Sequence, residues 1–253
     1  MNDSTASSPP SSPLDSVKVL LLQARTSAQM ERQERLCFLE RARLRSDQLA
    51  ALSVLRDPLP PRLLNDADAV FIGGAGEYSA YNDFPWMPGL LDFVRRTADE
   101  QRPLFGSCWG HQIIARALGG RVVHDSERSE LGCRSVSLTQ AGASDPLFGT
   151  LPETFKANMG HHDRVAELPD GAIELACNEQ PNQAFRMPDW PCYGTQFHSE
   201  LDAKRERERL VEYRDYYRDD LPSDKDFQAV LDNLTETPEV DDLLHRFLKM
   251  YAV

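Results

Sequence analysis

The sequence predicts an α/β protein with an open, mostly parallel sheet and helices on both faces, and three observations support this. Short apolar runs typical of buried strands alternate with segments of helical spacing. Two of these runs end in glycine-containing turns, at residues 73–74 and 106–110. With 41% hydrophobic residues, the 253-residue chain can build one substantial core. Strands that alternate with helices form a parallel sheet covered on both faces.

The first half of the chain supplies the alternation. Residues 17–22 are apolar and β-branched at their start, as in a central strand. Residues 30–44 are charged but carry spaced leucines, which indicates a surface helix that packs one face. The elements that we predict here are strands at 17–22, 68–72 and 103–107 and helices at 30–44, 87–98 and 111–118.

The second half continues with strands and ends in helices. We predict strands at 121–123, 134–139 and 193–197 and a helix at 205–217. Beyond them, apolar residues recur with helical spacing from Phe227 to Leu234 and from Leu243 to Tyr251. We expect one domain, residues 17–253, on which residues 202–253 pack as a helical extension. Residues 1–16 are rich in Ser and Pro, which predicts a disordered tail.

The composition excludes several classes of function. A formal charge of −12 and a pI near 5.0 argue against nucleic acid as a partner, because phosphates need a basic surface. No apolar run is long enough to span a bilayer, and the N-terminus lacks the apolar core of a secretory signal. Five cysteines, an odd number, indicate free thiols in a reducing compartment. We therefore expect a cytoplasmic enzyme that does not act on membranes.

Residues 106–110, Gly-Ser-Cys-Trp-Gly, lie between a predicted strand and a predicted helix. Small residues flank a reactive one in this way where the turn is too sharp for larger side chains, as in a nucleophile elbow. The turn would hold Cys108 at a helix N-terminus, where the dipole favours a thiolate and a developing oxyanion. The other four cysteines have no such surroundings and are expected to be ordinary apolar side chains.

A second segment, residues 194–200, ends the last predicted strand and contains His198 and Glu200. Residues i and i+2 of an extended segment point the same way, so the imidazole and the carboxylate can lie on one face. His198 would act as a base towards Cys108, and Glu200 would orient the ring.

These two segments resemble the signature motifs of class I, triad-type glutamine amidotransferases. Further likenesses are Gly73-Gly74 after a strand and the segments at residues 130–132, 145–148 and 159–163. The likeness covers roughly residues 17–201 and is greatest to stand-alone proteins similar to the amidotransferase half of GMP synthetase. One departure is Ser199, where the family usually has proline. The resemblance implies a flavodoxin-like fold.

The resemblance also implies a reaction and site residues. The reaction is hydrolysis of the glutamine side-chain amide through a cysteinyl γ-glutamyl thioester, with no cofactor and no metal. The catalytic residues would be Cys108, His198 and Glu200, and the backbone N–H groups of Gly74 and Trp109 would stabilise the oxyanion. Residues expected to bind the glutamyl group are Gln112, by its side chain, and Gly160 and His161, by their main chain.

Other interpretations of the same residues remain open at this point. Cys108, Asp163 and His198 follow the order nucleophile–acid–base, which is that of an α/β-hydrolase with a thiol nucleophile. Residues 161–163 offer His-His-Asp to a metal, although consecutive residues rarely converge on one ion. Residues 74–79 only partly match a dinucleotide-binding loop, because Ser79 stands at the third glycine.

Three functions fit the predicted architecture. The chain could supply ammonia to a separate synthetase, its partner protein, or act alone as a γ-glutamyl hydrolase or peptidase on another γ-glutamyl amide. A third class is a binding protein without catalysis, against which the complete set of Cys108, His198 and Glu200 argues. The sequence contains no P-loop, so ammonia use would require that partner.

Overall fold

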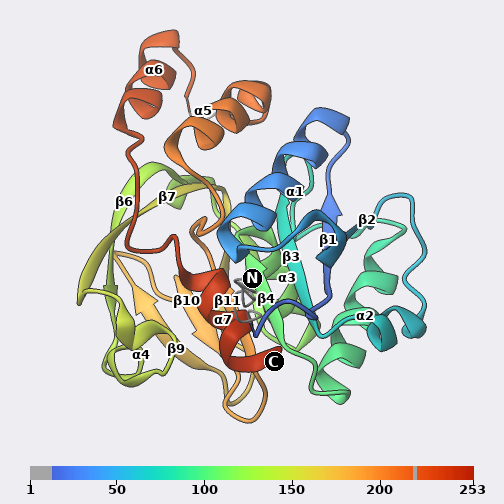
Figure 1. The fold of residues 1–253 in the computed structure, drawn as a ribbon. Coiled ribbons are helices and arrows are strands. Elements are labelled where there is room, and N and C mark those ends of the chain that lie inside the picture. Colours follow the sequence, from blue (N-terminus) through green and yellow to red (C-terminus); the bar gives the residue numbers. More distant parts are fainter. Residues whose placement is uncertain (1–12, 219–220) are drawn as a thin grey trace, which may run out of the picture.

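The computed structural model describes residues 13–218 and 221–253, and Figure 1 shows the arrangement of its elements. Nine strands of this part of the chain form one sheet in the order β2-β1-β3-β4-β11-β10-β9-β6-β7. From β2 to β11 the neighbours pair in parallel, and from β11 to β7 they pair antiparallel. The strands are β1 (Val19–Ala24), β2 (Leu49–Ser53), β3 (Ala69–Ala75), β4 (Leu104–Ser107), β6 (Glu130–Leu138), β7 (Thr154–His161), β9 (Ile173–Cys177), β10 (Ala184–Arg186) and β11 (Cys192–Thr195). The predicted fold class is confirmed.

One face of the parallel half is covered by α1 (Ala28–Ala42) and α7 (Leu243–Tyr251). Phe38 of α1 packs on Phe71 of β3 with ring centroids 5.4 Å apart. Phe247 of α7 packs on Phe105 of β4 at 5.5 Å. The last helix of the chain thus returns to the centre of the sheet and lies beside the first one, as Figure 1 shows.

The opposite face is covered by α2 (Met87–Asp99) and α3 (Trp109–Ala117). Because strand side chains alternate between faces, the residues next to those of the first core point here. Ile72 and Leu104 belong to this second core together with Ile113 of α3 and Leu90 of α2. Both faces of these strands are therefore buried, which is why their sequences are almost continuously apolar.

The antiparallel half contains more strands than the sequence predicted. Strands β7, β9 and β10 were not foreseen, and a separate two-stranded ribbon pairs β5 (Arg121–His124) with β8 (Asp163–Glu167). Polar and charged residues interrupt these strands, so their patterns are weak. A short helix, α4 (Gln140–Ser144), packs beside them.

Residues 202–253 form the expected helices. Helix α7 covers one face of the sheet, and the elements before it form a separate cluster. Helix α5 (Ala203–Glu212) continues into a 3-10 turn, η5 (Arg214–Tyr217), and is followed by α6 (Asp224–Asn233). These elements stand beyond the ends of β6 and β7 in Figure 1 and form a third, smaller apolar cluster with Met30 and Leu131.

The N-terminal boundary lies earlier than Val17. The predicted disordered tail, residues 1–16, falls outside the described residues up to residue 12. Residues 13–16 form a turn, in which Leu14 is buried and its carbonyl accepts a hydrogen bond from Gln48 Nε2. Within the described ranges, no helix has the length and apolar character needed to cross a membrane.

Candidate active site

Cys108 occupies a sharp turn between β4 and α3. Its backbone angles, φ 52° and ψ −104°, lie outside the regions that residues other than glycine ordinarily adopt. A Cβ on Gly106 would lie 2.5 Å from the Gly110 backbone, and a Cβ on Gly110 would lie 2.2 Å from the carbonyl oxygen of Ile72. Both flanking glycines are therefore required by close backbone packing, which holds Cys108 in the geometry of a nucleophile elbow.

His198 lies beyond the end of β11, beside Cys108. Its Nδ1 is 2.8 Å from Glu200 Oε1, and its backbone bridges to Asn158 of β7. Burial lowers the pKa of His198, but the charges of Glu200 and Glu206 outweigh it, so the pKa is raised well above its usual value. Because Nδ1 contacts the carboxylate, Nε2 is the ring nitrogen left for the thiol.

Glu200 is held by residues from three parts of the chain. Besides His198, it contacts Ser107 Oγ at 2.6 Å and Arg209 Nη1 at 3.3 Å, and it is fully buried. Burial raises the pKa of Glu200, but His198, Arg209 and Ser107 reverse this, so the pKa is lowered and the side chain stays ionised. Glu200 therefore orients the imidazole of His198 and stabilises its protonated form.

A buried chain of charges continues behind this pair. Arg209 is 3.7 Å from Glu34 of α1, and Glu34 accepts a hydrogen bond from Arg25 at 2.8 Å. Glu34 also accepts the backbone N–H of Gly74 at 3.0 Å. The oxyanion role of Gly74 stays a prediction, and it would require this N–H to exchange its buried acceptor, Glu34, for the oxyanion. The role of Trp109 also stays a prediction, and the position of this residue as the first of α3 supports it, because the first N–H groups of a helix lack intrahelical acceptors.

The residues predicted to bind the glutamyl group lie near the nucleophile. The carbonyl of Gly160 is 3.9 Å from the Cys108 Sγ. The amide of Gln112 is buried and donates to the Asp163 carbonyl at 2.6 Å and to Gln196 Oε1 at 3.0 Å, and Gln196 in turn reaches Cys108 Sγ at 3.8 Å. Gln112 thus lies one side chain away from the thiol, and its two donor contacts lie within the protein.

The side chain of His161 is held by Asp163 and Glu130, and the predicted main-chain role of this residue stays a prediction. Its Nδ1 is 3.0 Å from the Asp163 carbonyl, and its Nε2 is 3.4 Å from Glu130 Oε2. Burial raises the pKa of Glu130, but this histidine and hydrogen bonds from Asn178 and Gln183 outweigh that effect, so the pKa is lowered.

The alternative triad with Asp163 as the acid is not formed. The Asp163 carboxylate contacts Ser79 Oγ at 2.6 Å and His124 Nδ1 at 2.9 Å, and His198 is paired with Glu200 instead. Asp163 therefore ties the loop after β3 to β8. Among the residues that the structure describes, no group of three or more His, Cys, Asp or Glu side chains is clustered so that it could hold a metal ion.

Helix α5 and the turn η5 of the C-terminal extension cover the nucleophile and form the roof of the site, an arrangement that the sequence did not predict. A cavity of about 20 Å³ beside Cys108 is bounded below by strand-end residues such as Arg25 and Ala75. Glu206 and Tyr217 of α5 and η5 bound it above, and the Tyr217 hydroxyl donates to the Gly160 carbonyl at 3.1 Å. This volume holds about one water molecule. A glutamyl group is larger than this volume, so we infer that α5 and η5 shift to admit a substrate.

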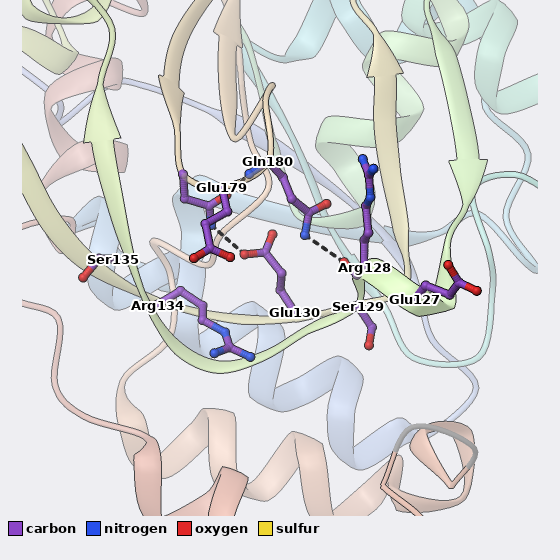
Figure 2. Close-up of a pocket in the computed structure, with 9 residues that line it drawn as sticks. Glu127, Arg128, Ser129, Glu130, Arg134, Ser135, Glu179 and Gln180 are labelled. Carbon is purple, nitrogen blue, oxygen red and sulfur yellow. Dashed lines mark hydrogen bonds between the residues drawn. The ribbon is translucent and has the colours of Figure 1, made fainter.

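A larger hollow, of about 660 Å³, lies elsewhere, between β6 and the loop that precedes β10. Figure 2 shows Glu130 projecting into it between Gln180 and Arg134, with Asn178 and Arg128 taking part in the marked hydrogen bonds. Neither Cys108 nor His198 lines this hollow. Glu130 connects it to the surroundings of the nucleophile through contacts with His161 and Gln183.

Three other cysteines have thiols that resist ionisation. Burial raises the pKa of Cys37 to about 12 and raises the pKa of the fully buried Cys192 well above its usual value. Burial and Glu174 raise the pKa of Cys177 as well. At neutral pH these thiols stay protonated, which makes them poor nucleophiles.

Comparison with known proteins gives a consistent picture. The family model for class-I glutamine amidotransferase matches residues 48–214. The chain is 33% identical over 143 residues to a subunit of glutamine-hydrolyzing GMP synthase from Sulfurisphaera tokodaii, covering 56% of this chain and 72% of that protein. It is 29% identical over 143 residues to gamma-glutamyl peptidase 5 of Arabidopsis thaliana, covering 56% and 57%.

Solved structures show the same fold. A glutamine amidotransferase from Thermotoga maritima superposes with a TM-score of 0.74 at 23% identity, covering 93% of this chain and 98% of that one. A glutamine amido transferase from Methylobacillus flagellatus gives a TM-score of 0.65 at 25% identity and covers 93% and 90%.

Proposed function

The chain belongs to the class-I glutamine amidotransferase family, and on this premise we propose that it hydrolyses the side-chain amide of glutamine to glutamate and ammonia. The observation that carries the proposal is the elbow conformation of Cys108 beside the His198–Glu200 pair. A strained cysteine, an adjacent imidazole and a buried carboxylate that orients the ring are the parts that acyl transfer from an amide requires.

In the first half of the reaction, the Cys108 thiol gives its proton to Nε2 of His198, whose raised pKa favours the protonated ring, and the resulting thiolate attacks the amide carbon. The oxyanion that forms lies at the start of α3, where the Trp109 N–H can donate to it. When the tetrahedral intermediate collapses, the C–N bond breaks and His198 gives the proton to the departing nitrogen. Ammonia leaves, and a γ-glutamyl thioester remains on Cys108.

In the second half, water attacks the thioester while His198 takes a proton from it. The C–S bond breaks, the proton returns to the sulfur, and glutamate leaves. Glu200 stays ionised throughout, because its pKa is lowered by His198, Arg209 and Ser107 against the effect of burial. Its charge stabilises the imidazolium that forms in both halves.

The test is release of glutamate and ammonia from glutamine by the purified chain, with Cys108→Ala as the inactive control. We expect Cys108→Ala to lose at least about 10³-fold in kcat/KM. A glutamine-analogue alkylator, mapped by peptide mass spectrometry, should label Cys108 and spare Cys37, Cys177 and Cys192, whose thiols stay protonated. Activity that persists in Cys108→Ala would disprove the proposal.

A second candidate is a stand-alone hydrolase or peptidase for another γ-glutamyl amide. The observation that favours it is that the chain roofs its own nucleophile with Tyr217 and Glu206, so no other protein is needed to enclose the site. The similarity to a gamma-glutamyl peptidase also supports it. Turnover of γ-glutamyl dipeptides faster than glutamine by the isolated chain would select this candidate. Glutamine hydrolysis that appears only after addition of a cell-extract fraction would select a protein gated by a separate synthetase.

A further inference from the structure

Glu206 is a buried carboxylate that the reaction described above does not use. It lies in the first turn of α5, is only 2% exposed and lines the cavity beside Cys108. Its Oε2 has no hydrogen-bond partner among the residues that the structure describes. Leaving a buried charged oxygen unsatisfied is costly, so a carboxylate retained in such a place indicates a cationic or hydrogen-bond-donating ligand.

The neighbouring charges pair with one another and leave Glu206 without a partner. The buried groups at the cavity and directly behind it are three carboxylates, Glu34, Glu200 and Glu206, two guanidinium groups, Arg25 and Arg209, and the imidazole of His198, which is paired with Glu200. Both guanidinium groups already contact Glu34 or Glu200. Glu206 is left as the carboxylate whose charge has no partner at ion-pair distance among the described residues, so a positive group on the substrate would complete the set.

The position of Glu206 fits the head of a γ-glutamyl substrate. A Cβ built on Gly160 would lie 3.2 Å from Glu206 Oε1, while the carbonyl of Gly160 is 3.9 Å from Cys108 Sγ. Gly160 therefore lies against both the thiol and the carboxylate. In a γ-glutamyl group, only three carbons separate the α-ammonium from the reacting carbonyl. Gly160 alone lies between the Cys108 thiol and the Glu206 carboxylate, so a substrate whose carbonyl is at the thiol can bring its α-ammonium to Glu206.

We propose that Glu206 is a specificity-determining residue that pairs with the α-ammonium group of the γ-glutamyl substrate when α5 closes over the site. This inference rests on the proposed function and deepens it. Because the group sits on α5, recognition of the free amino group is coupled to closure. Amides without that group would leave the Glu206 carboxylate buried and unpaired, and the enzyme would reject them.

The experiment compares kcat/KM for glutamine with kcat/KM for glutaramate, which is glutamine without its α-amino group. Wild-type protein, Glu206→Gln and Glu212→Gln are assayed on both; Glu212 is an exposed carboxylate on the same helix and serves as the matched control. We expect wild-type protein to prefer glutamine by roughly 30-fold or more, the size of a lost buried charge pair. Glu206→Gln should reduce this preference to near unity by losing activity on glutamine, and Glu212→Gln should retain it.

The outcomes separate this inference from the proposed function. Equal use of glutamine and glutaramate by the wild-type protein would overturn the role of Glu206 without any variant, so a misfolded variant cannot obscure the answer. An equal loss on both substrates in Glu206→Gln, with the acid limb of the pH profile moved to lower pH, would mean that Glu206 acts through His198 and would also overturn it. A wild-type protein that hydrolyses no γ-glutamyl amide would instead disprove the proposed function, and the inference with it.

Discussion

The elbow and the roof of the site are built on different principles. The elbow, residues 106–110, is fixed by contacts at the backbone, where Gly106 and Gly110 leave no room for a side chain. The roof, formed by α5 and η5, is fixed by side chains that reach across more than a hundred residues of sequence, such as Arg25 to Tyr213 at 3.1 Å. The elbow is therefore rigid and local, whereas the roof rests on contacts that substrate entry must break.

The largest expected effect is that of Gly110→Ala in the elbow. The new methyl group would lie 2.2 Å from a backbone oxygen of β3, so α3 would have to lift off the sheet. We expect a loss of about 3 kcal/mol or more in the free energy of unfolding, measured by urea titration. Gly89→Ala in α2 is the matched control, because its Cβ meets no atom within 4 Å; it should gain about 0.5–1 kcal/mol. Equal stability of the two variants would contradict the packing described here.

The second prediction concerns Glu200, the residue that the elbow and the roof share. Arg209→Gln removes the roof's contact and leaves buried carboxylates underpaired, which should cost about 3 kcal/mol of stability. Ser107→Ala removes the elbow's hydrogen bond and should cost about 1.5–3 kcal/mol. Both variants should also lower kcat. Urea titration measures the loss of stability, and steady-state kinetics measure the loss of kcat. A larger loss for Ser107→Ala than for Arg209→Gln would reverse the assigned order.

The third prediction is that the free energy of unfolding depends on pH through His111, which lies in α3 directly after the elbow. Burial lowers the pKa of His111 to about 3, so the folded protein keeps the ring neutral while the unfolded chain binds a proton near pH 6.5. The stability that this provides is complete above pH 6.5 and is lost as the pH falls towards 3, by up to about 1.4 kcal/mol per pH unit. His111→Gln should remove this contribution. Identical slopes for the two proteins between pH 4 and 6.5 would disprove it.

The smallest expected effect is that of Tyr217→Phe in the roof. The variant keeps the aromatic ring stacked on His162 and removes only the hydrogen bond to the Gly160 carbonyl. Loss of one such bond is worth about 0.5–1.5 kcal/mol, so the roof should open more readily. We expect kcat/KM for glutamine to rise by roughly two- to tenfold if opening limits substrate entry. A tenfold fall would mean that the hydroxyl contacts the substrate instead.

Sequence patterns predicted most of the parallel half of the fold, but they missed its edge strand β2 (Leu49–Ser53). The predicted strands and helices up to α3 appear within a few residues of their expected positions, because their buried faces impose strong apolar periodicity. The antiparallel strands β7, β9 and β10 were missed because they are short or interrupted by polar residues. Their existence depends on pairing partners distant in sequence, which a local pattern does not record.

The candidate site divides in the same way. The sequence by itself determined the elbow around Cys108 and the pairing of His198 with Glu200, because steric exclusion and the two-residue repeat of an extended chain act over a few residues. Only the tertiary structure decided that Glu34 occupies the N–H of Gly74 and that Glu206 faces the nucleophile's cavity. Those contacts join segments far apart in the chain, and a single charged residue on a charged helix gives no sign of the partner that folding brings to it.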